Sequence, residues 1–175
     1  EQIYPKNTVI FNHGDPVTSC YYMLSGVAHY SVSFKQGRET STGLYLPDRV
    51  ISPSGPVASG SVFTLSECRL LRMDTKELIE TAYNDPAFAK SYEAHLMSEH
   101  NGSLMGAVLN AQLDVEERIA LFFQMLALEK GMEVKSGYYT TGYKFSHEFI
   151  CHFVSANRVT VSKILSSWQK EGNII

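Results

Sequence analysis

The chain has 175 residues, of which 44% are hydrophobic and 11% aromatic, a composition ordinary for a globular protein that buries a core. No apolar run approaches the roughly 18 residues that a membrane span needs, and the first residues do not read as a signal peptide, so we expect a cytoplasmic protein without a membrane partner. With a formal net charge of −3, the chain lacks the excess of basic residues typical of a nucleic-acid-binding protein, so any affinity for DNA would rest on a few placed cations. The three cysteines, Cys20, Cys68 and Cys151, are odd in number and far apart, which argues against a disulfide framework.

The first 73 or so residues have the pattern of short strands separated by turns. In the run 28–34, Ala28, Tyr30 and Val32 share one face and His29 and Ser31 the other, which predicts a half-buried strand with a polar outer face. Many short strands with regularly placed glycines favour an antiparallel roll or barrel. The strands are expected over residues 8–11, 20–24, 28–34, 43–46 and 61–73.

Two helices are predicted next. A capping box of Asp74 and Glu77 begins a short helix that ends near residue 83, and Asp85 with Pro86 opens a long one. Apolar and amide side chains then recur at steps of 4, 3, 4 and 3, the spacing of a coiled-coil seam between two copies of a helix. The same stripe could instead pack on the protein's own roll. The seam consists of Met97, Asn101, Leu104, Val108 and Ala111.

The last 30 residues predict two short helices around a tight turn. Ser146 can cap the first helix, and Asn157 can cap the second after a turn over residues 155–157. An apolar stripe on the second helix would bury against the first, which leaves its other face free to enter a DNA major groove. The stripe consists of Val161, Ile164, Leu165 and Trp168.

Two segments carry a family resemblance. Residues 157–165, N-R-V-T-V-S-K-I-L, followed by E-G-N-I-I at 171–175, resemble the DNA reader of the cyclic-AMP receptor/fumarate-nitrate regulator (CRP/FNR) family of bacterial transcription factors. Residues 113–120, in which Asp114 and Glu117 form a second capping box, resemble the family's junction between its central helix and its DNA-binding domain.

The resemblance implies an α+β fold with three parts. Residues 1–84 would form a jelly-roll-like β-roll that senses an effector, 85–113 a central dimerisation helix, and 114–175 a winged helix-turn-helix domain whose wing would follow Ile175. The partners it implies are double-stranded DNA, a second copy of the chain and RNA polymerase.

The family's DNA-contacting positions can be carried over residue by residue. Val159 stands where the family usually has a glutamate that accepts from cytosine, and valine can only pack on a thymine methyl group. We therefore expect a palindromic operator in which A·T replaces the G·C pair common in the family's half-sites. Ser155 replaces the family's turn glycine. We therefore expect a left-handed backbone at Ser155, which destabilises the fold by about 1 kcal/mol relative to glycine. The DNA-contacting positions are Asn157, Arg158, Val159, Thr160, Ser162 and Lys163.

The effector is expected to be a small molecule other than a cyclic nucleotide. Family members that bind cyclic nucleotides use an acid for the ribose and an arginine for the phosphate, and residues 52–60 contain neither. Small neutral side chains remain, which suit an uncharged or aromatic ligand, although they could equally be surface loop residues. They are Tyr45, Ser52, Ser59, Ser61, Asn101 and Met105.

Redox and metal cofactors are not expected. Three scattered thiols cannot ligate a four-thiolate iron-sulfur cluster in one chain, although a thiol switch through Cys20 or Cys68 stays open. His95 and His100 do not share a helix face, which argues against haem or a metal.

Two other functions remain as alternatives. A jelly-roll enzyme of the cupin kind would need clustered histidine and glutamate ligands, which His13 and His29 do not supply, so no enzymatic activity is expected. A β-roll regulatory module that acts on a protein partner, with a vestigial DNA reader, is the other, because residues 114–175 carry 7 Lys+Arg against 7 Asp+Glu and are neutral.

Overall fold

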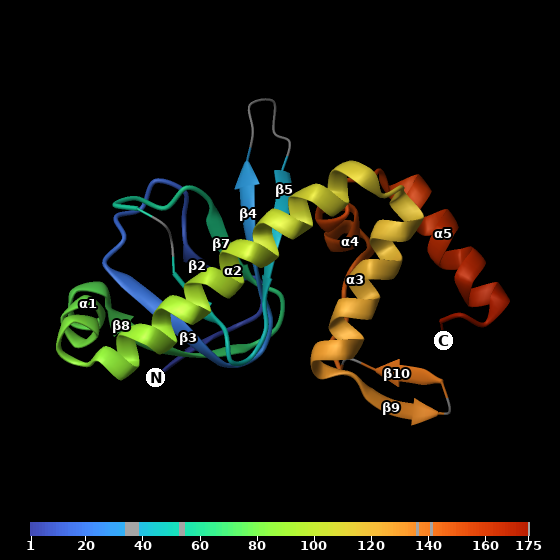
Figure 1. Ribbon diagram of the computed structural model, residues 1–175. Coiled ribbons are helices and arrows are strands. Elements are labelled where there is room, and N and C mark those ends of the chain that lie inside the picture. The colour runs from blue at the N-terminus through green and yellow to red at the C-terminus, as the bar shows by residue number, and fades with distance from the viewer. Residues whose placement is uncertain (34–38, 53–54, 136, 141, 175) are drawn as a thin grey trace. The chain divides into compact units, whose positions relative to one another are not determined.

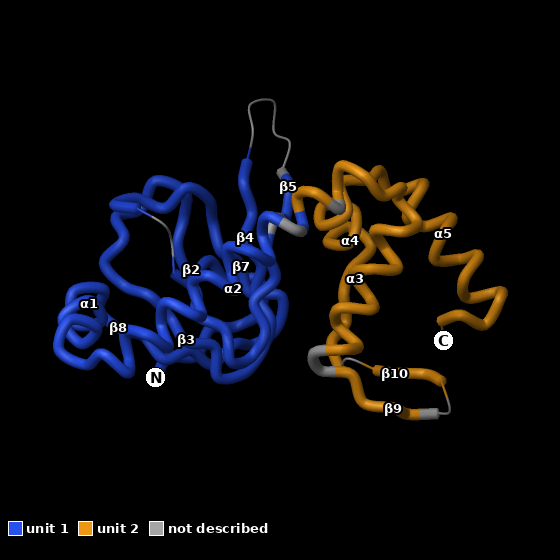
Figure 2. The backbone as a smooth tube through the Cα atoms, in the orientation of Figure 1, with its two compact units in different colours: residues 1–106 blue, residues 107–175 orange. Residues whose placement is uncertain are grey.

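The computed structural model describes residues 1–33, 39–52, 55–135, 137–140 and 142–174 (Figure 1). The chain divides into two compact units, Glu1–Gly106 and Ala107–Ile175, and each is treated separately (Figure 2). The long helix α2, Pro86–Gln112, begins in unit 1 and ends in unit 2.

Unit 1 contains the expected β-roll, built from two four-stranded sheets in which neighbouring strands pair antiparallel. One sheet has the order β1-β8-β3-β6, with β1 at Gln2–Tyr4, β8 at Cys68–Asp74, β3 at Ser19–Ser25 and β6 at Val50–Ile51. The other has the order β2-β7-β4-β5, with β2 at Val9–Phe11, β7 at Ser61–Thr64, β4 at Ala28–Ser33 and β5 at Glu39–Tyr45. A buried cluster from both sheets forms the core, as expected for facing sheets of alternating pattern. It consists of Met23, Ala28, Ile51, Val62, Cys68 and Leu70.

Two polar residues of β4, His29 and Ser31, are buried, contrary to the sequence prediction, whereas Ser33 on the same face is exposed. His29 is only 9% exposed and Ser31 only 1%. Nδ1 of His29 lies 2.7 Å from Oγ of Ser41, and its ring stacks on Phe63 at a centroid distance of 5.5 Å. Neighbouring strands therefore supply the hydrogen-bonding and stacking partners that let polar groups be buried. Phe34, the last residue of the predicted strand, lies outside the described residues.

Helices α1, Thr75–Asn84, and α2 both begin at an aspartate whose side chain accepts from backbone amides; the cap at Asp74 was predicted, and the one at Asp85 was not. Oδ1 of Asp74 accepts from the backbone N–H groups of Lys76 and Glu77 at the start of α1. Asp85 accepts from Ala87 N at 2.9 Å and Phe88 N at 3.1 Å at the start of α2. These bonds satisfy amides that the first helical turn leaves unpaired.

After the end of α2, the described residues of unit 2 form three helices and a hairpin. The helices are α3 at Val115–Lys130, α4 at His147–Phe153 and α5 at Arg158–Glu171. The hairpin, β9 at Met132–Lys135 and β10 at Tyr138–Thr140, was not predicted, although Gly137 marks its turn with a φ of 78°. The helices meet in an apolar core contributed by Ile119, Phe122, Leu126, Phe149, Ile150, Val154, Val161 and Leu165.

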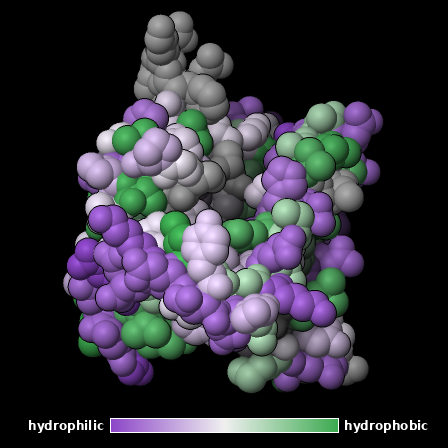
Figure 3. Space-filling model, turned by 60° about the vertical axis from the view of Figure 1, so that its left-hand side comes forward, coloured by the Kyte–Doolittle hydropathy of each residue, from purple (hydrophilic) through white to green (hydrophobic). Residues whose placement is uncertain are grey.

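The surface mixes polar and apolar side chains. Figure 3 shows one face on which hydrophobic side chains stand in small groups among hydrophilic ones. No helix within the described ranges is long and apolar enough to cross a membrane.

The close approach at Gly60 gives a test of the roll. A Cβ atom there would lie 2.5 Å from the Ser31 carbonyl oxygen and 2.6 Å from Cζ of Tyr30. Gly60→Ala should therefore lower the free energy of unfolding by about 1–3 kcal/mol, measured by urea denaturation.

Gly102 in α2 is the matched control, because its Cβ would meet nothing within 4 Å. Gly102→Ala should raise the stability by up to about 1 kcal/mol, since alanine favours a helix. Equal and small effects at both glycines would contradict the described packing.

Candidate nucleic-acid interface

Helix α5 is fixed at both ends. Oδ1 of Asn157 accepts from the backbone N–H of Thr160 at 2.9 Å and from its hydroxyl at 3.0 Å, which confirms the predicted cap. At the other end Gly172 has a φ of 78°, and its N–H is bonded to Gln169 O. The helix therefore begins and ends at defined residues, as capped helices do.

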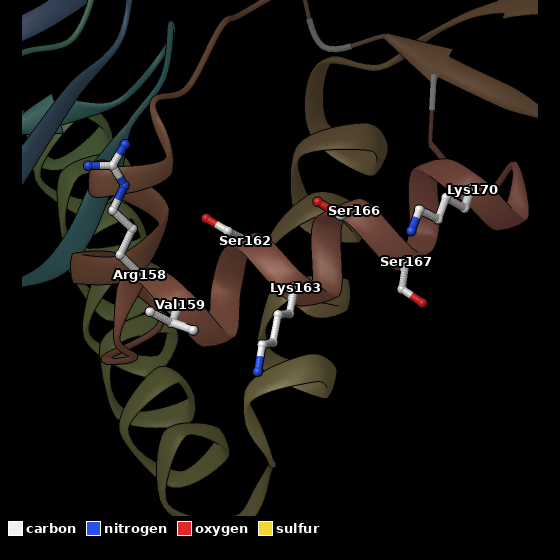
Figure 4. A pocket seen from close by; sticks show the side chains of 7 residues that line it. All are labelled: Arg158, Val159, Ser162, Lys163, Ser166, Ser167 and Lys170. Atoms are coloured by element: carbon white, nitrogen blue, oxygen red, sulfur yellow. The ribbon is translucent and has the colours of Figure 1, made fainter.

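One side of α5 is buried and the opposite side is open. Val161 is fully buried and Leu165 is 7% exposed, whereas Val159 is 64% exposed and Arg158 and Lys163 are also exposed. Figure 4 shows seven side chains, all carried by this one helix. We call this set the open face: Arg158, Val159, Ser162, Lys163, Ser166, Ser167 and Lys170.

The charge of the open face is positive. It carries three cations, Arg158, Lys163 and Lys170, and its remaining members are hydroxyls and one valine. One carboxylate lies at its C-terminal end, where Oε1 of Glu171 accepts from the Ser167 hydroxyl at 2.7 Å. This local charge differs from the neutral balance of residues 114–175. Such a face can donate hydrogen bonds to an anion or to acceptor-rich base edges.

The turn between α4 and α5 is tight and left-handed at one residue. Ser155 has a φ of 51°, as predicted for the position where the resemblance calls for glycine. The N–H of Ala156 donates to Cys151 O at 2.9 Å, which closes the turn. Cys151 is 6% exposed, and its side chain is small enough to let α4 and α5 approach closely.

Aromatic packing holds α3 and α4 together beneath α5. The ring of Phe122 on α3 lies 5.2 Å from Phe145, 6.1 Å from Phe149 and 4.8 Å from Phe153, centroid to centroid. These distances are typical of aromatic pairs that stabilise a core. Trp168 of α5 donates from Nε1 to Oε1 of Glu116 on α3 at 2.7 Å. The far end of α5 is thereby attached to the same scaffold.

Arg118 links three parts of unit 2. Its Nε donates to Val154 O at 2.9 Å, at the end of α4, and its Nη1 donates to Leu113 O at 2.6 Å and Asn110 O at 3.3 Å, at the end of α2. Carbonyls at a helix C-terminus lack intrahelical partners, and a guanidinium satisfies several at once. The capping box of Asp114 and Glu117, with bonds of 2.9 Å each way, fixes the backbone from which Arg118 projects. The sequence did not single out Arg118.

Two serines of the predicted effector set have partners within unit 1. Oγ of Ser59 lies 2.7 Å from the hydroxyl of Tyr30, and Oγ of Ser61 accepts from His13 N at 2.9 Å. Backbone bonds also join residues 14–17 to 56–58, among them Ala58 N to Asp15 O at 2.9 Å. The segment is therefore tied to the neighbouring loop.

The other members of that set lie in different surroundings. Burial raises the pKa of Tyr45 well above its ordinary value, and the nearby Glu99 carboxylate and Tyr30 raise it further, so its hydroxyl stays neutral. Ser52 is half-buried and Asn101 is exposed, while the side chain of Met105 lies outside the described part of the chain. The hollow described in unit 1, about 70 Å³, is lined by other residues, including Phe11, Tyr21 and Arg72.

The three cysteines are buried and unpaired. Burial raises the pKa of each thiol, and Cys20 and Cys68 donate from Sγ to Met73 O and Val27 O. A raised pKa leaves little thiolate, the reactive form, near neutral pH. In the described ranges, no three His, Cys, Asp or Glu side chains lie close enough to hold a metal ion.

The predicted seam on α2 is open to solvent. Met97, Leu104 and Val108 are 55%, 59% and 50% exposed, and Asn101 and Ala111 are also exposed. Apolar side chains on an exposed helix face are available to a second helix.

A model of the cyclic nucleotide-binding domain matches residues 1–84. The nitrogen fixation regulation protein FixK of Azorhizobium caulinodans is 25% identical over 173 residues, which cover 98% of this chain and 70% of that protein. The global nitrogen regulator of a Nostoc species is 21% identical over 176 residues, 97% of this chain and 78% of that protein.

Solved structures share the fold over almost the whole chain. FixK2 from Bradyrhizobium japonicum superposes with a TM-score of 0.85 at 19% identity, covering 98% of this chain and 84% of that one. A CRP/FNR-family transcriptional regulator from Thermus thermophilus gives a TM-score of 0.75 at 18% identity, with 98% and 86% covered.

Removal of the Arg118 guanidinium tests its linking role. Arg118→Met keeps an aliphatic stem but leaves the Val154 and Leu113 carbonyls without their donor. The free energy of unfolding should fall by about 1–3 kcal/mol, as read from chemical denaturation.

Arg69→Met supplies the control, because Arg69 is exposed and its guanidinium forms an exposed ion pair with Glu1. An exposed ion pair contributes at most about 1 kcal/mol, so this variant should be nearly as stable as the parent. If both variants lost the same free energy of unfolding, the hydrogen bonds from Arg118 to the carbonyls would contribute no more to stability than an exposed ion pair.

Proposed function

We propose that the chain belongs to the CRP/FNR family of bacterial transcription regulators and that it binds a palindromic operator as a homodimer under the control of a small-molecule effector. The relatives named above are regulators and not enzymes. On a promoter, the bound dimer would have RNA polymerase as a further partner.

The open face of α5 is the observation that carries this proposal. Its cations and hydroxyls stand out from unit 2, while Val161 and Leu165 anchor the opposite side. A helix with its side chains is about 10–12 Å across and a major groove is about 12 Å wide, so the open face can reach base edges.

Each residue of the reader has a proposed role. Arg158 and Lys163 donate to guanine or to phosphate, Ser162 donates or accepts, and Val159 packs on a thymine methyl group. Asn157 and Thr160, which bond to each other in the cap, lie at the helix N-terminus, where free amides favour a nearby phosphate.

Two copies of the reader would compensate for its small number of cations. Each phosphate that a cation neutralises adds about −0.9 to the slope of log affinity against log salt concentration, so a dimer with twice as many cations would have a steeper salt dependence than one reader. Linked readers bind half-sites about one helical turn apart with higher avidity than one alone. The exposed seam on α2 is the proposed dimer contact: Met97, Asn101, Leu104, Val108 and Ala111.

The proposed effector is uncharged or aromatic and not a cyclic nucleotide. Residues 52–60 offer neither an acid for a ribose nor an arginine for a phosphate diester, and an unpaired buried phosphate is strongly unfavourable. The proposed contacts are neutral hydroxyls, amides and a thioether: Tyr45, Ser52, Ser59, Ser61, Asn101 and Met105.

A protein-binding role for the β-roll with an inactive reader is the second candidate. The observation that favours it is the neutral charge of residues 114–175. Salt-dependent binding to a palindrome separates the two, because a vestigial reader would show no sequence preference.

Val159 gives a sharp test of DNA reading. We expect binding-site selection with the parent to return A·T opposite residue 159. Val159→Glu should shift the preference there to a pair with an accessible cytosine N4 amine, changing discrimination by about 1–3 kcal/mol.

Val134→Glu is the matched control, since Val134 is 58% exposed on β9 and carries the same charge change. It should leave the selected operator unchanged. A parent that selects G·C opposite residue 159, or a Val159→Glu variant with an unaltered operator, would contradict the proposed reading.

The dimer contact can be tested at Leu104. Leu104→Glu places two like charges at the centre of the seam, and the variant should sediment as a monomer at concentrations where the parent is a dimer. Leu128→Glu, at a leucine that is 81% exposed on α3, should leave the dimer intact. A Leu104→Glu dimer as tight as the parent would exclude this seam.

A further inference from the structure

A bond from α4 reaches the open face of α5. Nδ1 of His147, the first residue of α4, lies 3.2 Å from Oγ of Ser162. His147 is exposed and Ser162 is half-buried. The two helices are thus joined at the surface as well as through their apolar core.

The backbones that carry these two side chains are well anchored. Oγ of Ser146 accepts from Phe149 N at 3.1 Å, and Phe149 and Ile150 are buried, which fixes the first turn of α4. On α5, Ser162 follows the fully buried Val161 directly. The distance between His147 and Ser162 is therefore set by helix packing and not by a loop.

A serine hydroxyl alone is a poor reader of sequence. It has one donor and two acceptor sites and rotates freely, so it can serve any base. Its bond to an imidazole nitrogen removes part of this freedom. If Nδ1 carries the proton, the hydroxyl is left to donate outward; if Nδ1 is bare, the hydroxyl donates to it and offers lone pairs outward.

We propose that His147 is a positioning residue that fixes the direction of the Ser162 hydroxyl and so makes Ser162 selective for one base. This inference rests on the proposed function, because it requires the open face to lie in a major groove. The ligand class is a base edge of double-stranded DNA, and His147 acts on it through Ser162.

The test compares operators point by point. Affinities for the selected operator and its single-base variants are measured for the parent, Ser162→Ala, His147→Ala and the double variant. Ser162→Ala and His147→Ala should each lose about three- to tenfold discrimination at the same base pair, the size of one neutral hydrogen bond. The double variant should lose no more than either single one, because both remove the same interaction.

Two further variants separate positioning from general structural damage. His147→Gln, which can still bond to Ser162, should recover part of the lost discrimination. His152→Ala changes the other histidine of α4, about 140° away around the helix axis, and should leave every base preference unchanged.

Three results would overturn the inference while leaving the proposed function in place. They are a uniform loss of affinity over all operators with a shallower salt dependence, losses by the two single variants at different base pairs, and additive losses in the double variant. The first would show that His147 contacts phosphate directly. A parent that prefers no sequence at all would overturn the proposed function itself, and this inference with it.

Discussion

The packing of α5 on the rest of unit 2 decides which of its side chains remain for a partner. Val161 and Leu165 are buried one turn apart, so the rotation of the helix about its own axis is fixed. Trp168 adds a bond to Glu116 at the far end. Arg158, Val159 and Lys163 must then face outward. Any change that loosened the packing of the apolar side would also make the positions of these three side chains less well defined.

The second constraint lies where α2 ends. Arg118 donates to carbonyls at the end of α2 and to the last carbonyl of α4, one residue before the left-handed turn at Ser155. A displacement of the last turn of α2 would therefore strain or break bonds that hold the turn before the reader. This contact gives a physical route by which an event on α2 could alter α5 without a change in the reader's own residues.

Local chemistry was predictable from the sequence, and tertiary contacts were not. The caps at Asp74, Asp114 and Asn157 were foreseen because each bond joins residues two or three positions apart. The left-handed Ser155 followed from the resemblance to a motif with glycine there. The burial of His29 and Ser31 was missed because their neighbours come from other strands. The hairpin β9–β10 was missed because its two runs are short, and Gly137 was its main signal.

The candidate site divides in the same way. The N-terminal half of its open face, Arg158, Val159, Ser162 and Lys163, could be assigned from helical spacing, because an apolar stripe alternates with these residues along one short segment. Ser166, Ser167 and Lys170, which extend the face, were not predicted. The bond from His147 to Ser162 could not, because it spans 15 positions and depends on how two helices pack. The hydroxyls of Ser59 and Ser61 looked free in the sequence, yet they are bonded to Tyr30 and His13 in the folded unit.

Lysine acetylation in the presence and absence of operator DNA tests the central claim most directly. Lys163 lies on the open face and Lys90 on an exposed part of α2, so both should react readily in the free protein. If α5 enters the groove, saturating operator should protect Lys163 and leave Lys90 as reactive as before. Equal acetylation of Lys163 with and without a bound operator would contradict the account.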